Sequence, residues 1–271
     1  TDLISFSFEG RPLIGRKGES IAAALISTGI NYFRKSRGGR NRGLYCGMGT
    51  CFECLVTVDG HLSQRACLTQ LEPGMDIHVQ QYAPEPQYKK SHDGYSEFKG
   101  QSLPQSVELA VIGAGPGGLA GAISAAQAGV NVLVLDERAL AGGQYFKQPA
   151  IQSSSIHVRA FDKQSMKGAL LVKAAQDLNI KLVSKAMVWN IAQGEHGFDL
   201  YVIKDHKNYR VSAKQIIIAT GAYEKPFPVP GWTLPGFMTT GAFQTLLRAY
   251  RVAPGSRVLV CGNGPLNLQV A

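Results

Sequence analysis

Four of the five cysteines in this chain lie between residues 46 and 67. The first three, Cys46, Cys51 and Cys54, are spaced C-x4-C-x2-C in the stretch YCGMGTCFEC, and Cys67 follows after twelve intervening residues. Gly47 and Gly49 stand between the first two, where glycine lets a backbone approach a ligand closely and adopt positive φ. This concentration of thiols limits what the first third of the chain can fold into.

The spacing matches the plant-type pattern for a [2Fe-2S] cluster, in which one loop supplies three thiolates and a fourth comes from elsewhere. Three alternatives stay open. A four-cysteine zinc site usually takes paired C-x2-C arms, and only Cys51 and Cys54 form one. A thioredoxin-like pair at CFEC leaves Cys46 and Cys67 unexplained. Structural disulfides suit secreted chains, and no secretory signal is visible here. We therefore expect Cys46, Cys51, Cys54 and Cys67 to hold a [2Fe-2S] cluster.

The residues around the cysteines predict a small β-grasp domain over residues 1–82. Alternating apolar residues on either side of a Glu-Gly turn indicate a hairpin over residues 3–16. A helix is expected next, with Ile21, Ala24, Leu25 and Thr28 on one face and Gly29 as its stop. Further strands are expected at residues 54–60 and 75–80, with residues 61–67 returning between them.

Five basic residues, Arg34, Lys35, Arg37, Arg40 and Arg42, precede Cys46 with no acidic residue among them. One interpretation is a solvated loop. The other is positive potential beside an anionic cluster, which would raise its reduction potential or steer an acidic partner. The sequence favours neither.

A second set of motifs predicts dinucleotide binding. Residues 83–106 are polar and irregular, which is typical of a linker. The apolar strand at 109–112 then runs into GAGPGG, where Gly113 permits the tight turn, Gly115 lets the pyrophosphate approach, and Gly118 allows close packing of helix on strand. The helix that begins near Pro116 offers free N–H groups to phosphates. Asp136, eighteen residues after Gly118, is expected to bind the ribose, with Glu137 as the alternative.

Two later segments bear on which dinucleotide binds. A Gly-Gly-Gln turn follows Asp136, and an apolar strand at 214–218 runs into Ala-Thr-Gly. Together they resemble the FAD half of flavoproteins with two dinucleotide-binding domains, such as the thioredoxin and glutathione reductases. The resemblance implies an FAD-binding domain over 107–225, with strands at about 198–204 and 208–212 forming a small meander. Its expected further FAD contacts are Arg138, Gly143, Gln144, Met187, Val188, Ala219, Thr220 and Gly221.

A second dinucleotide-binding domain is expected to start within 226–271. The strand at 257–261 runs into GNGPLN, but Asn267 stands where the motif has its third glycine. Cys261 would end that strand as a buried small hydrophobic residue. Because a βαβ unit needs roughly 30 residues, this one does not close before Ala271, and we expect the sequence to be the front of a longer or processed polypeptide.

These motifs in this order resemble one protein family. A [2Fe-2S] β-grasp followed by GAGPGGLAGAISAAQAG, GGQ, ATGAYEKPFPVPGWTLPGFMTTGA and VLVCGNGPLNLQVA is similar to the α subunits of heteromeric FAD-dependent amine and amino-acid dehydrogenases. That family includes opine oxidases, hydrogen cyanide synthase, hydroxyproline and proline dehydrogenases and heterotetrameric sarcosine oxidase. The overall fold class implied is α/β, with the β-grasp domain ahead of a flavoprotein fold that has two dinucleotide-binding domains.

The resemblance also implies a division of labour. A separate FAD-containing β subunit, similar to D-amino-acid and glycine oxidases, oxidises the substrate, and a further small subunit is conceivable. The α chain receives and passes on the electrons through FAD and the [2Fe-2S] cluster, with a second nucleotide, NAD or ATP, in some members. We accordingly assign no catalytic residue in this chain. The reductase disulfide is missing after GGQ.

Two other functions stay open on the sequence. One is an NAD(P)H-dependent flavin reductase that feeds its own ferredoxin domain, and the other is a non-catalytic FAD-bound assembly scaffold. The net charge of +9 would suit nucleic acid, but aromatic residues do not interleave with the basic ones and no nucleic-acid motif occurs. No apolar run is long enough to span a membrane. We expect a cytoplasmic protein, with peripheral association at the inner membrane left open.

Overall fold

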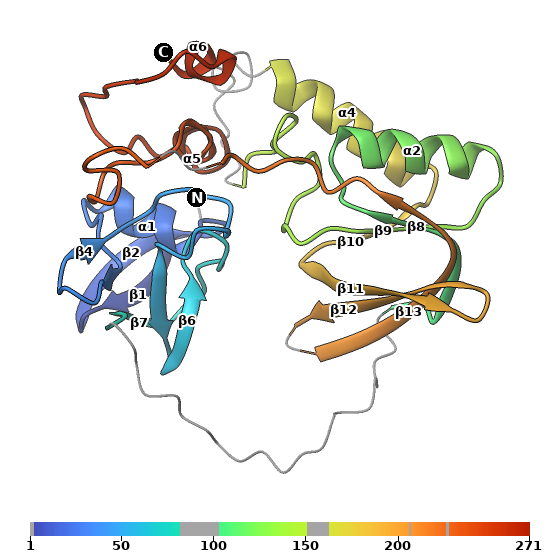
Figure 1. The fold of residues 1–271 in the computed structure, drawn as a ribbon, viewed down its shortest axis with the longest axis horizontal. Helices are drawn as coiled ribbons and strands as arrows, with labels where there is room; N and C mark the ends of the chain where they lie inside the picture. Colours follow the sequence, from blue (N-terminus) through green and yellow to red (C-terminus); the bar gives the residue numbers. More distant parts are fainter. Residues whose placement is uncertain (1–2, 82–102, 151–162, 206, 226–227) are drawn as a thin grey trace. The chain divides into compact units, whose positions relative to one another are not determined.

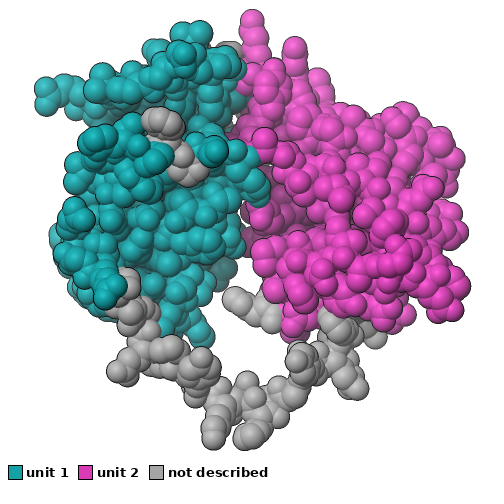
Figure 2. All heavy atoms as spheres, in the orientation of Figure 1, with its two compact units in different colours: residues 1–87, 149–154, 223–271 teal, residues 88–148, 155–222 magenta. Residues whose placement is uncertain are grey.

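The computed structural model describes residues 3–81, 103–150, 163–205, 207–225 and 228–271. They form two compact units, coloured teal and magenta in Figure 2. The first comprises Thr1–Gln87, Pro149–Ser154 and Tyr223–Ala271, and the second comprises Tyr88–Gln148 and Ser155–Ala222. Most of the predicted linker, residues 82–102, lies outside the described residues. At its end, Leu103 is buried in the second unit and the first strand there begins at Ser106.

A five-stranded mixed sheet organises the first unit, in the order β2-β1-β7-β5-β6 (Figure 1). The predicted hairpin forms, since β1 and β2 pair antiparallel around a turn in which Glu9 and Gly10 both have positive φ. Strand β1 also pairs with β7 in parallel. The strands are β1 (Leu3–Phe8), β2 (Arg11–Arg16), β5 (Leu55–Val58), β6 (His61–Arg65) and β7 (Asp76–Val79), with a separate pair of short strands β3 (Arg34–Lys35) and β4 (Asn41–Arg42).

Helix α1 (Ile21–Ser27) covers the apolar face of this sheet. Ser20 caps its start by accepting a hydrogen bond from the Ala23 N–H, and Gly29 follows its end at φ 85° as expected. The expectation of one apolar face was too narrow. All six residues from Ile21 to Ile26 are buried, whereas Thr28 is exposed, because the helix is enclosed on several sides.

Residues far along the chain help to enclose it. Helix α5 (Thr240–Thr245) continues into a π-helical turn, η1 (Leu246–Tyr250). Leu246 and Val252 belong to the same hydrophobic cluster as the strands and α1. The Arg16 guanidinium, paired with the fully buried Glu19, donates to the Tyr250 carbonyl at 2.7 Å. The core of the β-grasp unit therefore includes side chains contributed by residues 246–252.

A six-stranded sheet forms the second unit, in the order β10-β9-β8-β13-β12-β11. Strands β10, β9, β8 and the second half of β13 run parallel, while β11, β12 and the first half of β13 form an antiparallel meander. Their bounds are β8 (Ser106–Ile112), β9 (Val132–Leu135), β10 (Lys181–Val183), β11 (Ala186–Gly194), β12 (Gly197–Lys204) and β13 (Lys207–Ile218).

Helices α2 (Pro116–Gln127) and α4 (Lys163–Asp177) contact each other and lie on the same side of this sheet in Figure 1. Alternation along β8 supplies both faces. Leu109 and Val111 pack with α2 residues such as Leu119, while Ala110 and Ile112 pack with residues from the meander. Both faces of β8 are thus buried, which is typical of a central parallel strand.

Two expectations about strands were wrong. The predicted meander strand near 208–212 and the predicted strand at 214–218 are one continuous strand, β13, which changes partner from β12 to β8 along its length. The strand expected at 257–261 does not form, and Cys261 is exposed rather than buried. A parallel strand needs neighbours, and none of the described residues pairs with this segment.

The glycine motif that follows is formed only in part. Gly262 has φ 118°, Gly264 caps α6 (Pro265–Val270), and Asn267 occupies the third glycine position. The Asn267 side-chain amide donates to the Cys261 carbonyl at 3.1 Å and bonds to the Thr240 hydroxyl. Asn267 thus fills the space that a third glycine would leave open.

Candidate iron–sulfur and dinucleotide sites

The four clustered cysteines are arranged as two hydrogen-bonded pairs. Cys46 lies beside Cys51, and Cys54 lies beside Cys67. All are free thiols, and three of the four are buried. Among the described residues, no group of three or more His, Cys, Asp or Glu side chains converges on a single metal position. Two thiols on each side suit two irons, so the arrangement favours a [2Fe-2S] cluster over a four-cysteine zinc site.

Within each pair the two thiols share a proton. The hydrogen bond with Cys51 lowers the pKa of Cys46 to about 4 and raises that of Cys51. The hydrogen bond with Cys67 likewise lowers the pKa of Cys54, and raises the pKa of Cys67. Each pair is thus prepared to hold one thiolate, and metal binding would displace the other proton.

The loop also supplies donors to the sulfur atoms. The Met48 N–H and the Thr50 hydroxyl approach Cys46 Sγ at 3.4 and 3.6 Å, and the Glu53 N–H approaches Cys51 Sγ at 3.5 Å. Gly47 and Gly49 have φ values of 63° and 79°, as expected for a loop that turns its N–H groups inward. Such donors stabilise the extra charge of a reduced cluster.

The basic run before Cys46 divides into two groups. Arg34 and Arg42, on β3 and β4, form ion pairs with Glu53 at 2.9 and 3.6 Å, and all three side chains are less than 20% exposed. Arg37 and Arg40 are exposed. The run is therefore neither a wholly solvated loop nor a uniform positive patch, because two of its arginines position the residue whose N–H faces Cys51.

The glycine turn after β8 is held by close backbone contacts. Gly113 has φ 105°, and a Cβ there would lie 2.3 Å from the Ala219 carbonyl oxygen. A Cβ on Gly118 would lie 1.9 Å from the Gly113 carbonyl oxygen. Only glycine fits at these two positions, so the helix packs directly on the turn as predicted.

Gly115, the N-cap of α2, differs from its two partners. A Cβ there would meet only the Gly143 Cα, at an ordinary 3.8 Å. The space above Gly115 is therefore open in the folded chain and bounded by the Gly-Gly-Gln turn. Pro116 begins the helix, whose first N–H groups are directed to this space without a side-chain cap. A dinucleotide pyrophosphate fits such a cradle.

Asp136 lies at the same point. Its two carboxylate oxygens accept hydrogen bonds from the Ala114 and Arg138 N–H groups at 2.6 and 2.7 Å. Burial raises its pKa, and the two N–H bonds and the Arg138 charge oppose that rise. The carboxylate is thus fixed at the glycine turn, where a ribose hydroxyl is expected.

The structure brings most of the other predicted FAD contacts to this turn. Ala219 donates to the Ile112 carbonyl at 2.8 Å, and the Gln144 side chain donates to the Ala222 carbonyl at 3.3 Å. The Ala186 N–H donates to the Asp136 carbonyl, which brings the start of β11 and hence Met187 and Val188 beside Asp136. Glu137, Thr220 and Gly221 are exposed. Their roles as FAD contacts stay predictions.

Sequence reasoning missed the residues that join the cysteine loop to the later chain. Trp232 packs on the buried group of Tyr45, Cys46 and Met48, and Glu224 accepts from the Gly241 N–H at the start of α5. No local pattern identifies them, since the partners are more than 180 residues apart in the first case. The aromatic residues and turns of GWTLPGF were the one available signal.

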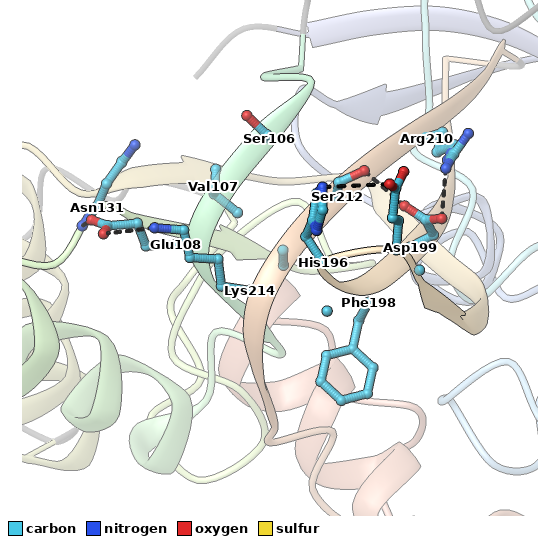
Figure 3. Close-up of a pocket in the computed structure, with 14 residues that line it drawn as sticks. Ser106, Val107, Glu108, Asn131, His196, Phe198, Asp199, Arg210, Ser212 and Lys214 are labelled. Carbon is cyan, nitrogen blue, oxygen red and sulfur yellow. Dashed lines mark hydrogen bonds and ion pairs between the residues drawn. The ribbon is translucent and has the colours of Figure 1, made fainter.

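A pocket lined by polar residues lies at the opposite end of β8 from the glycine turn (Figure 3). Its charges are already paired. The Asp199 carboxylate accepts from Arg210 and Ser212 at 2.6 and 2.7 Å, which lowers the pKa of Asp199, and Glu108 accepts from the Asn131 N–H. The pocket is therefore separate from the dinucleotide site and offers no unpaired group to a ligand.

Two family models match the chain. Residues 1–82 match the 2Fe-2S iron-sulfur cluster binding domain, and residues 107–271 match the pyridine nucleotide-disulphide oxidoreductase family. The chain belongs to the pyridine nucleotide-disulphide oxidoreductase family. This oxidoreductase carries FAD and a [2Fe-2S] cluster as its cofactors, and the geometry of both sites fits them. None of the helices formed by its described residues is both long and apolar enough to cross a membrane.

Individual relatives narrow the position within the family. The chain is 38% identical to the larger-than-itself opine oxidase polypeptide of Agrobacterium tumefaciens (strain Ach5), over 59% of the chain and 32% of that protein. It is 25% identical to the alpha polypeptide of sarcosine oxidase from Rhizobium meliloti (strain 1021), over 93% of the chain and 31% of that protein. The oxidoreductase thus groups with subunits of amine and amino-acid dehydrogenases, and spans about a third of the length of these relatives.

A solved structure agrees on the fold. The oxidoreductase superposes on L-proline dehydrogenase from P. horikoshii with a TM-score of 0.73 at 24% identity, covering 94% of this chain and 48% of that one. At this identity the likeness concerns the fold alone. The predicted class, a [2Fe-2S] β-grasp domain ahead of a Rossmann-like flavoprotein fold, is confirmed.

Proposed function

We propose that this chain is the electron-transferring part of a heteromeric flavin-dependent dehydrogenase that acts on an amine or amino acid. A separate subunit with its own FAD, similar to D-amino-acid and glycine oxidases, oxidises the substrate and hands electrons to this chain. The observation that carries the proposal is the presence of both redox sites in one chain, a dinucleotide cradle at Gly115 and four paired thiols at the cysteine loop. FAD takes electrons in pairs and the cluster passes them singly.

The cysteines argue against a disulfide reductase. All five are described and free, four of them in the metal loop, and the fifth, Cys261, is exposed far along the sequence from the glycine turn. A dithiol–disulfide chemistry beside the flavin therefore has no residues to use in this chain. The carboxylate at the turn, Asp136, is held by two N–H groups and is placed to bind a ribose rather than to take a proton from a substrate.

The names of the relatives indicate the substrate class. Opine oxidase and sarcosine oxidase both act, by name, on secondary amines derived from amino acids. We propose an opine, a proline-type amino acid, sarcosine or glycine as the donor, so that a CH–NH or CH–NH2 group is oxidised. The exposed pair Arg37 and Arg40 provides positive charge for steering an acidic electron-transfer partner.

The test compares the chain alone with the native complex co-purified from source cells. A dye-linked assay would use octopine, nopaline, L-proline, hydroxyproline, sarcosine and glycine as donors. We expect the chain alone to be inactive and the complex to oxidise at least one donor. Turnover by the chain alone would contradict the proposal. Rapid bleaching of the flavin in the chain by NADH would favour the reductase alternative instead.

A further inference from the structure

The cysteine loop is closed on one side by a segment that belongs, in sequence, to the flavoprotein part of the chain. The Tyr45 carbonyl accepts from the Thr239 N–H at 2.9 Å, and the Arg42 guanidinium donates to the Thr233 carbonyl at 3.2 Å. The segment is itself fixed, because Thr239 caps α5 and its hydroxyl bonds to the Glu224 carboxylate at 2.5 Å. These contacts all lie within the first unit, which Figure 2 shows in teal.

The closure leaves no room for water between the loop and α5. A Cβ on Gly47 would lie 2.9 Å from the Ala242 Cα, so the two backbones are in direct contact there. Next to this contact, Cys46 is fully buried and Met48 is 2% exposed. The side of the loop that bears the Cys46 thiolate is therefore dry.

Trp232 completes this enclosure. Its ring lies edge-on to Tyr45, with centroids 5.1 Å apart, and Phe237 stacks on Tyr45 at 6.2 Å. Trp232 packs on the buried group formed by Tyr45, Cys46 and Met48 and is half-buried itself. Aromatic contacts of this kind add specific packing energy to the apolar area that they bury.

We propose that Trp232 is a positioning residue of the iron–sulfur site, which it shields from water and whose reduction potential it lowers. The inference rests on the cluster occupying the paired thiols. Reduction adds one electron to an already anionic cluster, and a water-poor environment disfavours the more highly charged form. The shell around a metal site sets its solvent access and potential in this way. The iron–sulfur site is thus completed by residues of the flavoprotein part.

The chain offers a matched control, because it contains two tryptophans. Trp189, on β11 of the second unit, is 53% exposed and contacts Tyr201 rather than the cysteine loop. We would compare Trp232→Ala, Trp232→Phe and Trp189→Ala in the full chain. Iron and sulfide analysis establishes first that each variant holds the cluster. EPR-monitored titration with dithionite and mediators then gives the midpoint potential.

Trp232→Ala should raise the midpoint potential and release iron to a chelator several-fold faster than the unsubstituted chain, Trp232→Phe should shift both less, and Trp189→Ala should change neither. A second readout needs no change at Trp232. In Trp189→Phe, the remaining tryptophan should be quenched when the cluster is present and recover when it is removed. A potential in Trp232→Ala equal to that in Trp189→Ala, or unquenched Trp232 fluorescence in a cluster-loaded chain, would overturn the proposal. A chain without iron would instead refute the cluster itself.

Discussion

Gly118 and Gly117 are adjacent glycines in α2 for which we predict opposite effects of the same substitution. In Gly118→Ala the new methyl group would lie 1.9 Å from the Gly113 carbonyl oxygen. Ordinary carbon–oxygen contacts are about 3.3–3.6 Å, so the helix must move from the turn by more than an ångström. The turn cannot easily yield, since Gly113 N–H is bonded to the Leu135 carbonyl at 2.8 Å.

Forcing extra volume into a packed interior costs about 1–3 kcal/mol, and occasionally more. A glycine-to-alanine change in a helix returns about 0.5–1 kcal/mol. We therefore expect Gly118→Ala to lose about 2 kcal/mol of unfolding free energy. A Cβ on Gly117 meets nothing within 4 Å, so Gly117→Ala should keep only the helix gain and be as stable as the parent or slightly more so.

The assay is urea unfolding followed by Trp189 fluorescence in a Trp232→Phe background. Trp189 reports the unit that contains the glycine turn, so unfolding of the other unit does not obscure the transition. Equal midpoints and slopes for Gly117→Ala and Gly118→Ala would refute the close packing of α2 on the turn.

Three further predictions concern other surfaces. Gly115→Val should fold with unchanged secondary structure by circular dichroism but purify with little FAD, because its side chain occupies the open cradle; full flavin content would place the cofactor elsewhere. Arg37→Glu with Arg40→Glu should slow electron transfer in the complex more at low than at high salt, as stopped-flow absorbance would show, whereas Arg11→Glu on β2 should not; salt-independent slowing would exclude steering. The pKa of His78 is raised above 6.5 by its bond to Asp76, so it stabilises the fold below that pH and less as pH rises; His78→Gln should lower stability at pH 6 by under about 1 kcal/mol and not at pH 9, and equal effects at both would contradict this.

Local signals predicted the parts of both sites that depend on residues close in sequence. The C-x4-C-x2-C spacing, the turn at Glu9–Gly10 and the cap at Ser20 each act over a few residues, and each forms as the local chemistry requires. The glycine turn is equally local, because Gly113 and Gly118 contact each other across one helical turn.

What the sequence did not reveal depends on contacts between distant segments. Glu53 neutralises Arg34 and Arg42 across the cysteine loop, which no spacing rule specifies. Trp232 reaches Tyr45 from far along the chain. The apolar run at 257–261 predicts a strand by composition, but strand formation depends on pairing partners that the described residues do not provide.

The most direct test of the account is whether substrate electrons reach the cluster of this chain. The native complex, held without oxygen and without dye, would be mixed with each amine or amino-acid donor and frozen for EPR. We predict that an effective donor produces the signal of a one-electron-reduced [2Fe-2S] cluster within a single turnover, and that a complex with Cys51→Ser, which removes one thiol of the first pair, oxidises donor but shows no such signal. An EPR-silent cluster in a complex that turns over normally would contradict the proposed electron-transfer role.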